Sequence, residues 1–186
     1  NDKLHLEADP PGVDFLADVT WQWEEEVDKL GDLMRTVKVR VGVVLSKRGG
    51  ALTTMERPIR YYAGAPLGSG NQSVSWIHLD DLCRIFIKAI EDESCQGAYN
   101  AVAPEIVSNA ELTAAIAHAL NRPVIPIHVP AFVLKIVLGE MADMVLGSSK
   151  VSSEKIMKAG FEFSFPTLEM AFEDLYRRPL PSVGNN

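Results

Sequence analysis

The chain has 186 residues, of which 47% are hydrophobic and 23% are charged, and its formal net charge is -7. This size and composition predict one ordinary globular domain with a core, and they exclude a disordered or fibrous chain. The acidic balance disfavours a general nucleic-acid binder, which needs clustered Lys and Arg, so we expect no nucleic acid partner.

Membrane and metal partners are not expected either. The longest apolar run, at residues 130–138, is far shorter than the roughly 18 residues of a membrane span and is interrupted by Lys135. We expect no signal peptide, because the first residues lack a basic segment followed by an apolar one. Cys83 and Cys95 have no CxxC spacing or His partner, which favours a reduced, cytoplasmic protein without a metal site.

The first predicted element is a helix over residues 14–30, where apolar residues recur at helical spacing and Gly31 follows as a stop. Trp21 and Trp23 face different sides of this helix, so we expect one of them in the core and the other either at a subunit interface or packed in the core as well.

Residues 36–45 then read as a strand that is buried on both faces, which is typical of a parallel sheet. Arg40 lies inside this strand and needs either an internal carboxylate or a ligand phosphate, and we favour the carboxylate.

The middle of the chain alternates between helices and strands. A helix is expected over 51–62 despite Pro58, and a Gly-Ser-Gly turn at residues 68–70 leads into a strand. Asp80 is expected to cap the next helix, and Ser108 with Glu111 forms a capping box. The predicted elements after the turn are a strand at 73–79, a helix at 80–92, a strand at 97–103, and helices at 112–121, 131–146, 154–160 and 167–178.

The alternation of strands and helices predicts an α/β domain. A glycine-rich dinucleotide motif needs to follow a strand and open a helix, and the segment at residues 64–70 instead opens into a strand. The sequence therefore predicts a nucleotide-binding type of fold without its first half.

Five stretches, in this order, resemble one known family. They are "RVGVVLSKRGGAL", "PLGSGNQSVSWIHLDDL", "YNAVAPEIVSNAELT", "LGEMADMVL" and "KAGFEFSFPTLEMAFEDL". Together they are similar to the C-terminal part of atypical extended short-chain dehydrogenase/reductases, the NAD(P)-dependent sugar-nucleotide epimerase-like proteins. The resemblance runs from about Pro10 to Leu175, which is nearly the whole chain.

The resemblance implies the C-terminal portion of a Rossmann-type doubly wound parallel sheet with a small mixed α/β substrate lobe. Residues 1–186 would form one segment of this domain, with 47–75 and 120–166 contributing to the lobe. The glycine-rich βαβ unit, which holds the pyrophosphate, would be absent from this chain. The implied cofactor is NAD or NADP, with NADP slightly preferred, and its full site requires the missing N-terminal half.

The resemblance also assigns site residues. Val43 and Val44 would bind the cofactor beside the nicotinamide, and Arg40 joins them as a cofactor candidate through the ligand phosphate considered for it above. Gly49, Gly50, Gln72, Trp76 and His78 would lie on the side of a small-molecule substrate. Simpler structural roles stay open for some of them: the two glycines equally suit a surface turn, and His78 more often fixes a strand-to-helix junction than performs chemistry.

Typical extended members carry a Tyr-x-x-x-Lys pair on the helix before the "RVGVVL" strand, where the Tyr transfers a proton. Phe15 and Val19 occupy these positions here, so the usual chemistry is in doubt. The resemblance implies part of an NAD(P)-dependent epimerase, dehydratase or reductase acting on a small or nucleotide-linked substrate. The alternatives are an NAD(P)-binding protein without turnover and a structural or interaction module. It also implies a homodimer through the helix at 14–30.

Overall fold

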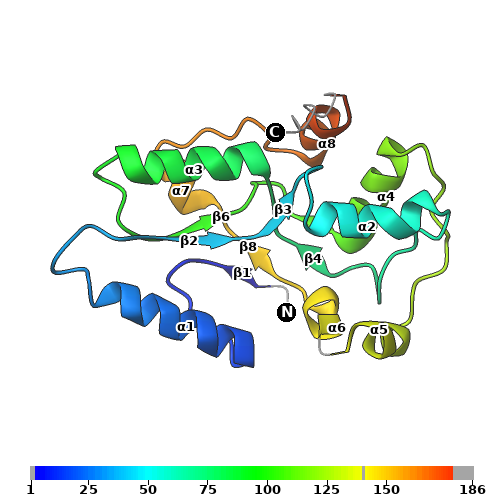
Figure 1. Ribbon diagram of the computed structural model, residues 1–186, viewed down its shortest axis with the longest axis horizontal. Helices are drawn as coiled ribbons and strands as arrows, with labels where there is room; N and C mark the ends of the chain where they lie inside the picture. The colour runs from blue at the N-terminus through cyan, green and yellow to red at the C-terminus, as the bar shows by residue number, and fades with distance from the viewer. Residues whose placement is uncertain (1–2, 140, 178–186) are drawn as a thin grey trace, which may run out of the picture.

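The computed structural model describes residues 3–139 and 141–177 (Figure 1). Its helices are α1 (Phe15–Asp28), α2 (Ala51–Arg60), α3 (Leu79–Glu91), α4 (Asn109–Ala119), α5 (Ala131–Leu138), α6 (Met141–Leu146), α7 (Glu154–Lys158) and α8 (Leu168–Arg177). Its strands are β1 (Leu4–His5), β2 (Val37–Val41), β3 (Val43–Leu45), β4 (Ser73–Val74), β5 (Trp76–His78), β6 (Gly97–Ala101), β7 (Val107–Ser108) and β8 (Lys150–Val151).

Parallel pairing dominates, as the sequence predicts for this α/β fold. β2 pairs with β6, β3 with β5 and β1 with β8, all in parallel, whereas β4 and β7 are antiparallel. The predicted strand at 36–45 is divided at Gly42, whose N–H donates to Ala101 O, while Val43 N donates to Ser75 O. A Cβ on Gly42 would lie 2.7 Å from the Ser75 carbonyl oxygen. The glycine therefore lets one continuous strand change partners from β6 to β5.

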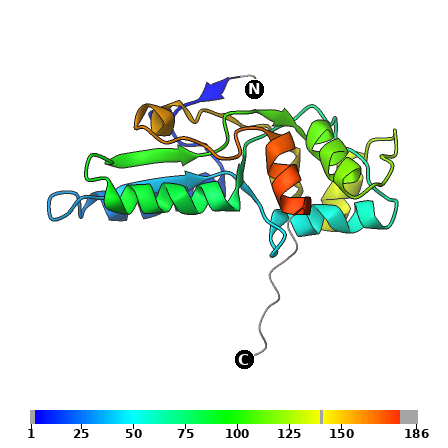
Figure 2. The same ribbon diagram turned by 90° about the horizontal axis from the view of Figure 1, so that it is seen from above.

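Two apolar clusters cover the sheet. The first, which we call the Trp76 cluster, joins β3 and β5 to α2, α4 and α8 through Leu45, Leu52, Ile59, Trp76, Leu112, Ile116, Leu168 and Phe172. The second, the Tyr99 cluster, joins α3 and α7 to β5 and β6 through Ile77, Leu82, Ile85, Tyr99, Ala101 and Ile156. Figure 2 shows α2, α4 and α8 grouped at one end of the molecule and α3 lying along the strands at the other.

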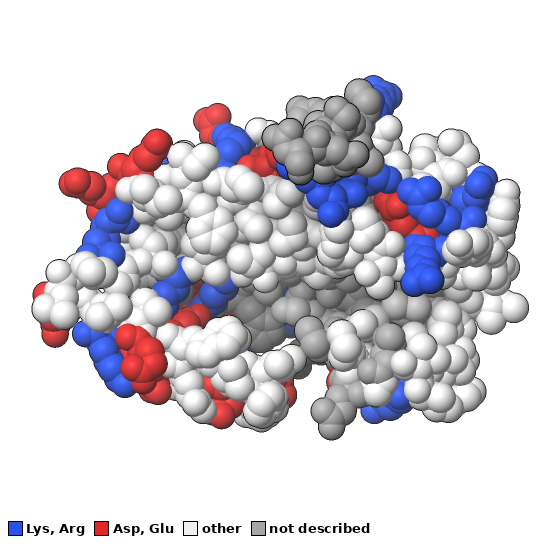
Figure 3. All heavy atoms as spheres, in the orientation of Figure 1, with Lys and Arg blue, Asp and Glu red and all other residues white. Residues whose placement is uncertain are grey.

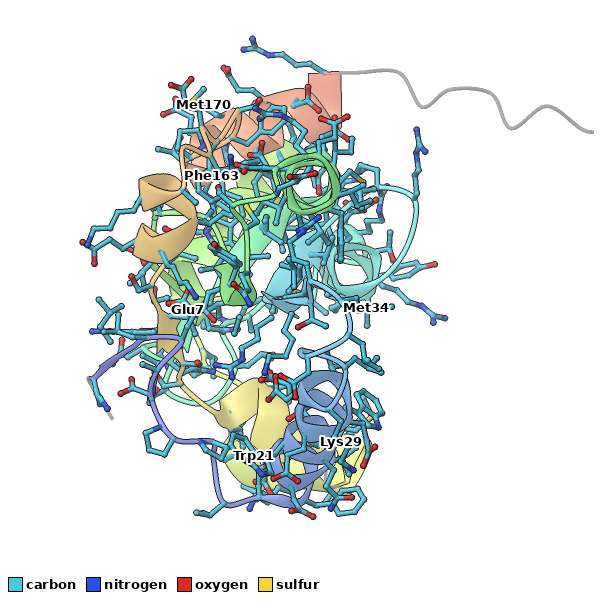
Figure 4. The ribbon with its side chains drawn as sticks, turned by 90° about the vertical axis from the view of Figure 1, so that its left-hand side faces the viewer. Glu7, Trp21, Lys29, Met34, Phe163 and Met170 are labelled. Atoms are coloured by element: carbon cyan, nitrogen blue, oxygen red, sulfur yellow. The ribbon has the colours of Figure 1, made fainter. Side chains whose placement is uncertain are left out.

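The predicted first helix is confirmed as α1, but its environment is not the expected one. Asp14 caps it by accepting a hydrogen bond from Ala17 N at 2.9 Å. No residue of α1 is buried, and Trp21 and Trp23 are 43% and 68% exposed. The expectation that one tryptophan lies in the core is therefore wrong for the described residues. Figure 4 shows Trp21 and Lys29 on this helix, on the opposite side of the molecule from Phe163 and Met170.

Three further sequence predictions need correction. The helix expected at 131–146 is two helices, α5 and α6, because Gly139 ends the first with a φ of 59°. The strand at 73–79 is interrupted at Ser75. Helix α3 is capped by the side chain of His78 and not by Asp80, which lies inside its first turn.

Other predicted ends are confirmed. The capping box of Ser108 and Glu111 opens α4, and Gly160 has the left-handed φ of 79° that suits the end of α7. The last helix is present as α8, while Arg178, its predicted final residue, is outside the described residues. None of the helices within residues 3–139 and 141–177 is long and apolar enough to cross a membrane.

Candidate functional site

The carboxyl ends of β3 and β5 lie side by side, because Leu45 is the register partner of His78. In open parallel sheets, ligands bind in the crevice outside such strand ends. Val43 and Val44 point to opposite faces: Val43 packs against the Trp76 cluster, and Val44 packs against the Tyr99 cluster. Figure 3 shows the molecule hollowed between the part that holds α2 and α3 and the part that holds α1, α5 and α6.

Gly49 and Gly50 lie in the loop that leaves the carboxyl end of β3. Both have positive φ, 138° and 81°, and Gly50 is the N-terminal cap residue of α2. A Cβ built on either glycine would meet no atom within 4 Å. The loop is therefore open at the strand end, and glycine is required there by the backbone and not by crowding.

His78 is a buried junction residue. Its Nδ1 accepts a hydrogen bond from Asp80 N at 3.1 Å, and its Nε2 lies 3.5 Å from Oδ2 of Asp174 on α8. Its ring packs against Phe165 with a centroid distance of 4.0 Å. Strand β5, helix α3 and the C-terminal segment thus meet at this imidazole, which is the junction role considered from the sequence.

Trp76 is fully buried in the cluster named after it. Its indole Nε1 has no hydrogen-bond partner among the described residues. A buried N–H without an acceptor is costly, and the full burial of Trp76 leaves this atom out of reach of solvent. The predicted substrate contact by Trp76 stays a prediction.

Gln72 is held inside the turn that precedes β4. Its side-chain Nε2 donates to the carbonyl oxygen of Leu67 at 2.9 Å and to that of Val145 at 3.3 Å. Gly68 and Gly70 have φ of 57° and 74°, and a Cβ on Gly68 would lie 2.6 Å from Leu146 Cδ2. The amide that the sequence offers to a ligand here ties the turn to α6, and its contact with substrate stays a prediction.

Arg40 has the internal carboxylate that the sequence favours for it. Its Nε and Nη2 donate to Glu24 Oε1 and Oε2 at 2.7 and 2.8 Å, and its Nη1 donates to Glu7 O at 2.9 Å. These hydrogen bonds hold the pKa of Glu24 below its ordinary value and raise that of Arg40. The fork connects β2 to α1, and Figure 4 shows Glu7 between the level of that helix and that of Phe163. Its role toward a cofactor stays a prediction.

Asp81 is a buried carboxylate whose contacts the sequence reasoning missed. It is 0% exposed and accepts hydrogen bonds from Ser164 N, Phe165 N and Arg84 Nη1 at 2.8 to 2.9 Å. From the sequence, the "DDL" stretch indicates only that a helix begins there. The two backbone donors to Asp81 lie more than 80 residues further along the chain, so no local pattern predicts them. Asp81 thereby holds the C-terminal segment over the strand ends.

No group of three or more His, Cys, Asp and Glu side chains is placed to hold a metal ion within the described parts of the chain. The site consists of the carboxyl ends of two strands, a glycine loop and a buried histidine where strand, helix and C-terminal segment meet. Val43, Trp76 and His78 lie together on β3 and β5, with Gly49 and Gly50 just beyond. Arg40 is directed toward α1 instead.

The chain is similar to known proteins in sequence and in fold. Residues 129–175 match a family model described as a domain of unknown function, DUF1731. The epimerase family protein SAR0825 of Staphylococcus aureus (strain MRSA252) is 40% identical over 168 residues, which cover 87% of this chain and 54% of that protein.

Two solved structures are also similar. The human epimerase family protein SDR39U1 (isoform 2), solved with NADPH, has a TM-score of 0.89 and 36% identity, and the match covers 96% of this chain and 61% of that one. A nucleoside-diphosphate sugar epimerase from Corynebacterium glutamicum has a TM-score of 0.76 and 29% identity, over 97% of this chain and 35% of that one. The chain spans about half the length of the curated relatives it matches, and its Rossmann-type fold is confirmed. By these similarities it belongs to the epimerase family proteins, the family that its five sequence stretches indicate.

Proposed function

We propose that the whole protein binds a nicotinamide dinucleotide, with NADP preferred, and uses it in epimerisation, dehydration or reduction of a small or nucleotide-linked substrate. The observation that carries this proposal is the similarity, at a TM-score of 0.89, to a human protein that was solved with NADPH. Residues 1–186 would supply the late strands and the substrate side, with residues 47–75 and 120–166 in the substrate lobe.

The open loop at Gly49 and Gly50 fits such a ligand, because nothing lies within 4 Å of a Cβ on either residue. In this proposal Val43 and Val44 border the nicotinamide ring, and the two glycines leave room for the substrate beside it. The cofactor, when bound, supplies hydride transfer. Arg40 contributes less to cofactor binding in this proposal, because Glu24 and the Glu7 carbonyl already accept its hydrogen bonds.

A second candidate function is cofactor binding without turnover. It is favoured by the residues at the usual Tyr-x-x-x-Lys positions, because Phe15 opens α1 and Val19 lies one turn further. Neither side chain transfers a proton.

The experiment combines binding with a turnover screen on full-length protein. Fluorescence titration with NADPH and NADH measures binding, and oxidation of NADPH is then followed with a panel of carbonyl compounds and nucleoside-diphosphate sugars. Binding with turnover supports the first function, and binding without turnover supports the second. Absence of binding to both cofactors contradicts both functions and favours an interaction module.

A matched pair of variants locates the site. Gly50→Val places a side chain in the proposed substrate space, whereas Gly97→Val places one at a similar positive φ at the start of β6. The two glycines have φ of 81° and 75°, and a Cβ on either meets nothing within 4 Å. We expect Gly50→Val to lower kcat/KM at least about tenfold relative to Gly97→Val, because misplaced substrate loses reaction geometry.

We also propose that α1 forms a homodimer contact. Phe15, Trp21 and Trp23 are 77%, 43% and 68% exposed, an apolar surface that is unusual unless another surface covers it. Sedimentation of full-length protein with and without the Trp23→Glu substitution tests this. A dimer that dissociates in the variant supports the contact, and a monomeric parent protein contradicts it.

A further inference from the structure

A cavity of about 490 Å³ lies beside α2, just after the carboxyl end of β3. Its lining consists of Lys47, Thr53, Glu56, Arg57, Arg60 and Tyr61. Three of these side chains are cationic and one is a carboxylate, so the cavity carries two net positive charges in a chain whose total is -7. Figure 3 shows Lys and Arg side chains gathered over this end of the molecule, around a small acidic area.

The carboxylate in the lining of this cavity, Glu56, is buried and orients the cations. Lys47 Nζ donates to Glu56 Oε1 at 2.9 Å, and Arg60 donates from Nε and Nη2 to Oε2 at 3.1 and 2.7 Å. Tyr176 OH donates to Oε1 as well. Burial acts to raise the pKa of Glu56, but these donors outweigh it and keep the pKa below its ordinary value.

The tyrosine supports the same geometry. Lys47 Nζ lies 3.8 Å from the centroid of the Tyr176 ring, and the Lys47 side chain is only 16% exposed. Burial and the hydrogen bond to Glu56 raise the pKa of Tyr176, so the phenol stays protonated and donates. The lysine ammonium is therefore positioned before any ligand arrives, which lowers the ordering cost of binding.

Donors remain for a ligand. The guanidinium of Arg57 has no hydrogen-bond partner within residues 3–139 and 141–177, and in the same residues Arg60 Nη1 makes no hydrogen bond. Lys47 uses one of its three N–H groups on Glu56. Several charged donors around a cavity are the chemistry that recognises a phosphate dianion, since Arg offers a planar fork and Lys a point charge.

We propose that this cavity is a binding site for the phosphate group of a small molecule. Arg57 and the remaining donors of Arg60 and Lys47 contact the phosphate oxygens. Glu56 and Tyr176 hold the side chains of Arg60 and Lys47 in place. The volume lies within the range of about 300 to 1,000 Å³ of small-molecule sites, so it accommodates an organic part next to Tyr61. This site does not depend on the proposed cofactor.

The test is calorimetric titration of full-length protein with inorganic pyrophosphate, before and after saturation with NADPH. We expect saturable binding in both cases. Arg57→Gln should weaken it about tenfold, because a charge-assisted fork is lost, while leaving Tm unchanged. Lys158→Gln, which removes an equal charge from the exposed Glu154 ion pair on α7, should weaken it less than about twofold, because an exposed charge far from the cavity is screened by salt.

Three results overturn the proposal. One is the absence of saturable binding. The second is equal weakening by the two substitutions, which would indicate general charge attraction. The third is loss of pyrophosphate binding once NADPH is present together with weaker NADPH binding by Arg57→Gln, because the cavity would then belong to the cofactor site. Failure of NADPH to bind at all would contradict the proposed function and leave the pyrophosphate result to be judged by the two variants alone.

Discussion

Two ends of the molecule differ in what holds their helices in place. Around Trp76, helices α2, α4 and α8 bury apolar side chains, and Leu112 and Ile116 are both 0% exposed. Helix α1 has no buried residue and meets the rest of the chain through charged groups, chiefly the fork between Glu24 and Arg40. The end around Trp76 is held by apolar packing, and the end at α1 is held by polar contacts.

The difference indicates which helices are stabilised by contacts within this chain. Apolar burial contributes in proportion to the area removed from water, so the Trp76 cluster stabilises itself. An ion pair at partial exposure contributes little, and exposed apolar side chains on α1 contribute almost nothing until another surface covers them. Substitutions in the Trp76 cluster should therefore change stability much more than substitutions on α1.

The largest expected effect is in the Trp76 cluster. Leu112→Ala should lower the free energy of unfolding of residues 1–186 by about 2 to 5 kcal/mol, through lost transfer energy and a cavity. Leu16→Ala on α1, where the side chain is 48% exposed, should lower it by less than about 0.5 kcal/mol. Urea denaturation of both variants measures the contrast, and equal losses would remove the distinction between the two ends.

The next effect concerns the buried carboxylate that holds the C-terminal segment. Asp81→Asn keeps the shape but points an amide group at donors, so we expect a loss of about 2 to 3 kcal/mol. Hydrogen exchange should speed up at Ser164 and Phe165, whose N–H groups donate to Asp81. Asp143→Asn, at a carboxylate whose side chain is 72% exposed, is the matched control and should shift Tm less. Unchanged exchange at both amides would contradict this role.

The smallest effect is at the polar end. Glu24→Gln should lower stability by about 1 kcal/mol, because the fork is charge-assisted but partly exposed. Arg40 holds the pKa of Glu24 below its ordinary value of 4.5, so this stabilisation is complete above that pH and is lost as pH falls through the lowered pKa. Thermal denaturation from pH 7 to pH 3 should therefore show the two proteins converging in acid. A constant difference would indicate packing instead of charge.

Local patterns were enough for most elements. The helix of α1, the capping box at Ser108 and the stop at Gly160 were predicted, because each depends on residues a few positions apart. The parallel sheet followed from the alternation of elements and from the β-branched run before Leu45. The family followed from five stretches in one order, and the comparisons confirm it.

Tertiary structure alone decided the partners. Gly42 divides one strand because Ser75, from a distant segment, approaches its backbone, and no local signal reports that approach. The acceptors of Arg40 and the backbone donors to Asp81 also come from distant segments. Glu56 reads as one more charge on a helix surface until Lys47, Arg60 and Tyr176 converge on it. The amino-acid sequence determines which groups the chain carries, whereas the free energy of burying a charge depends on which distant groups fold against it.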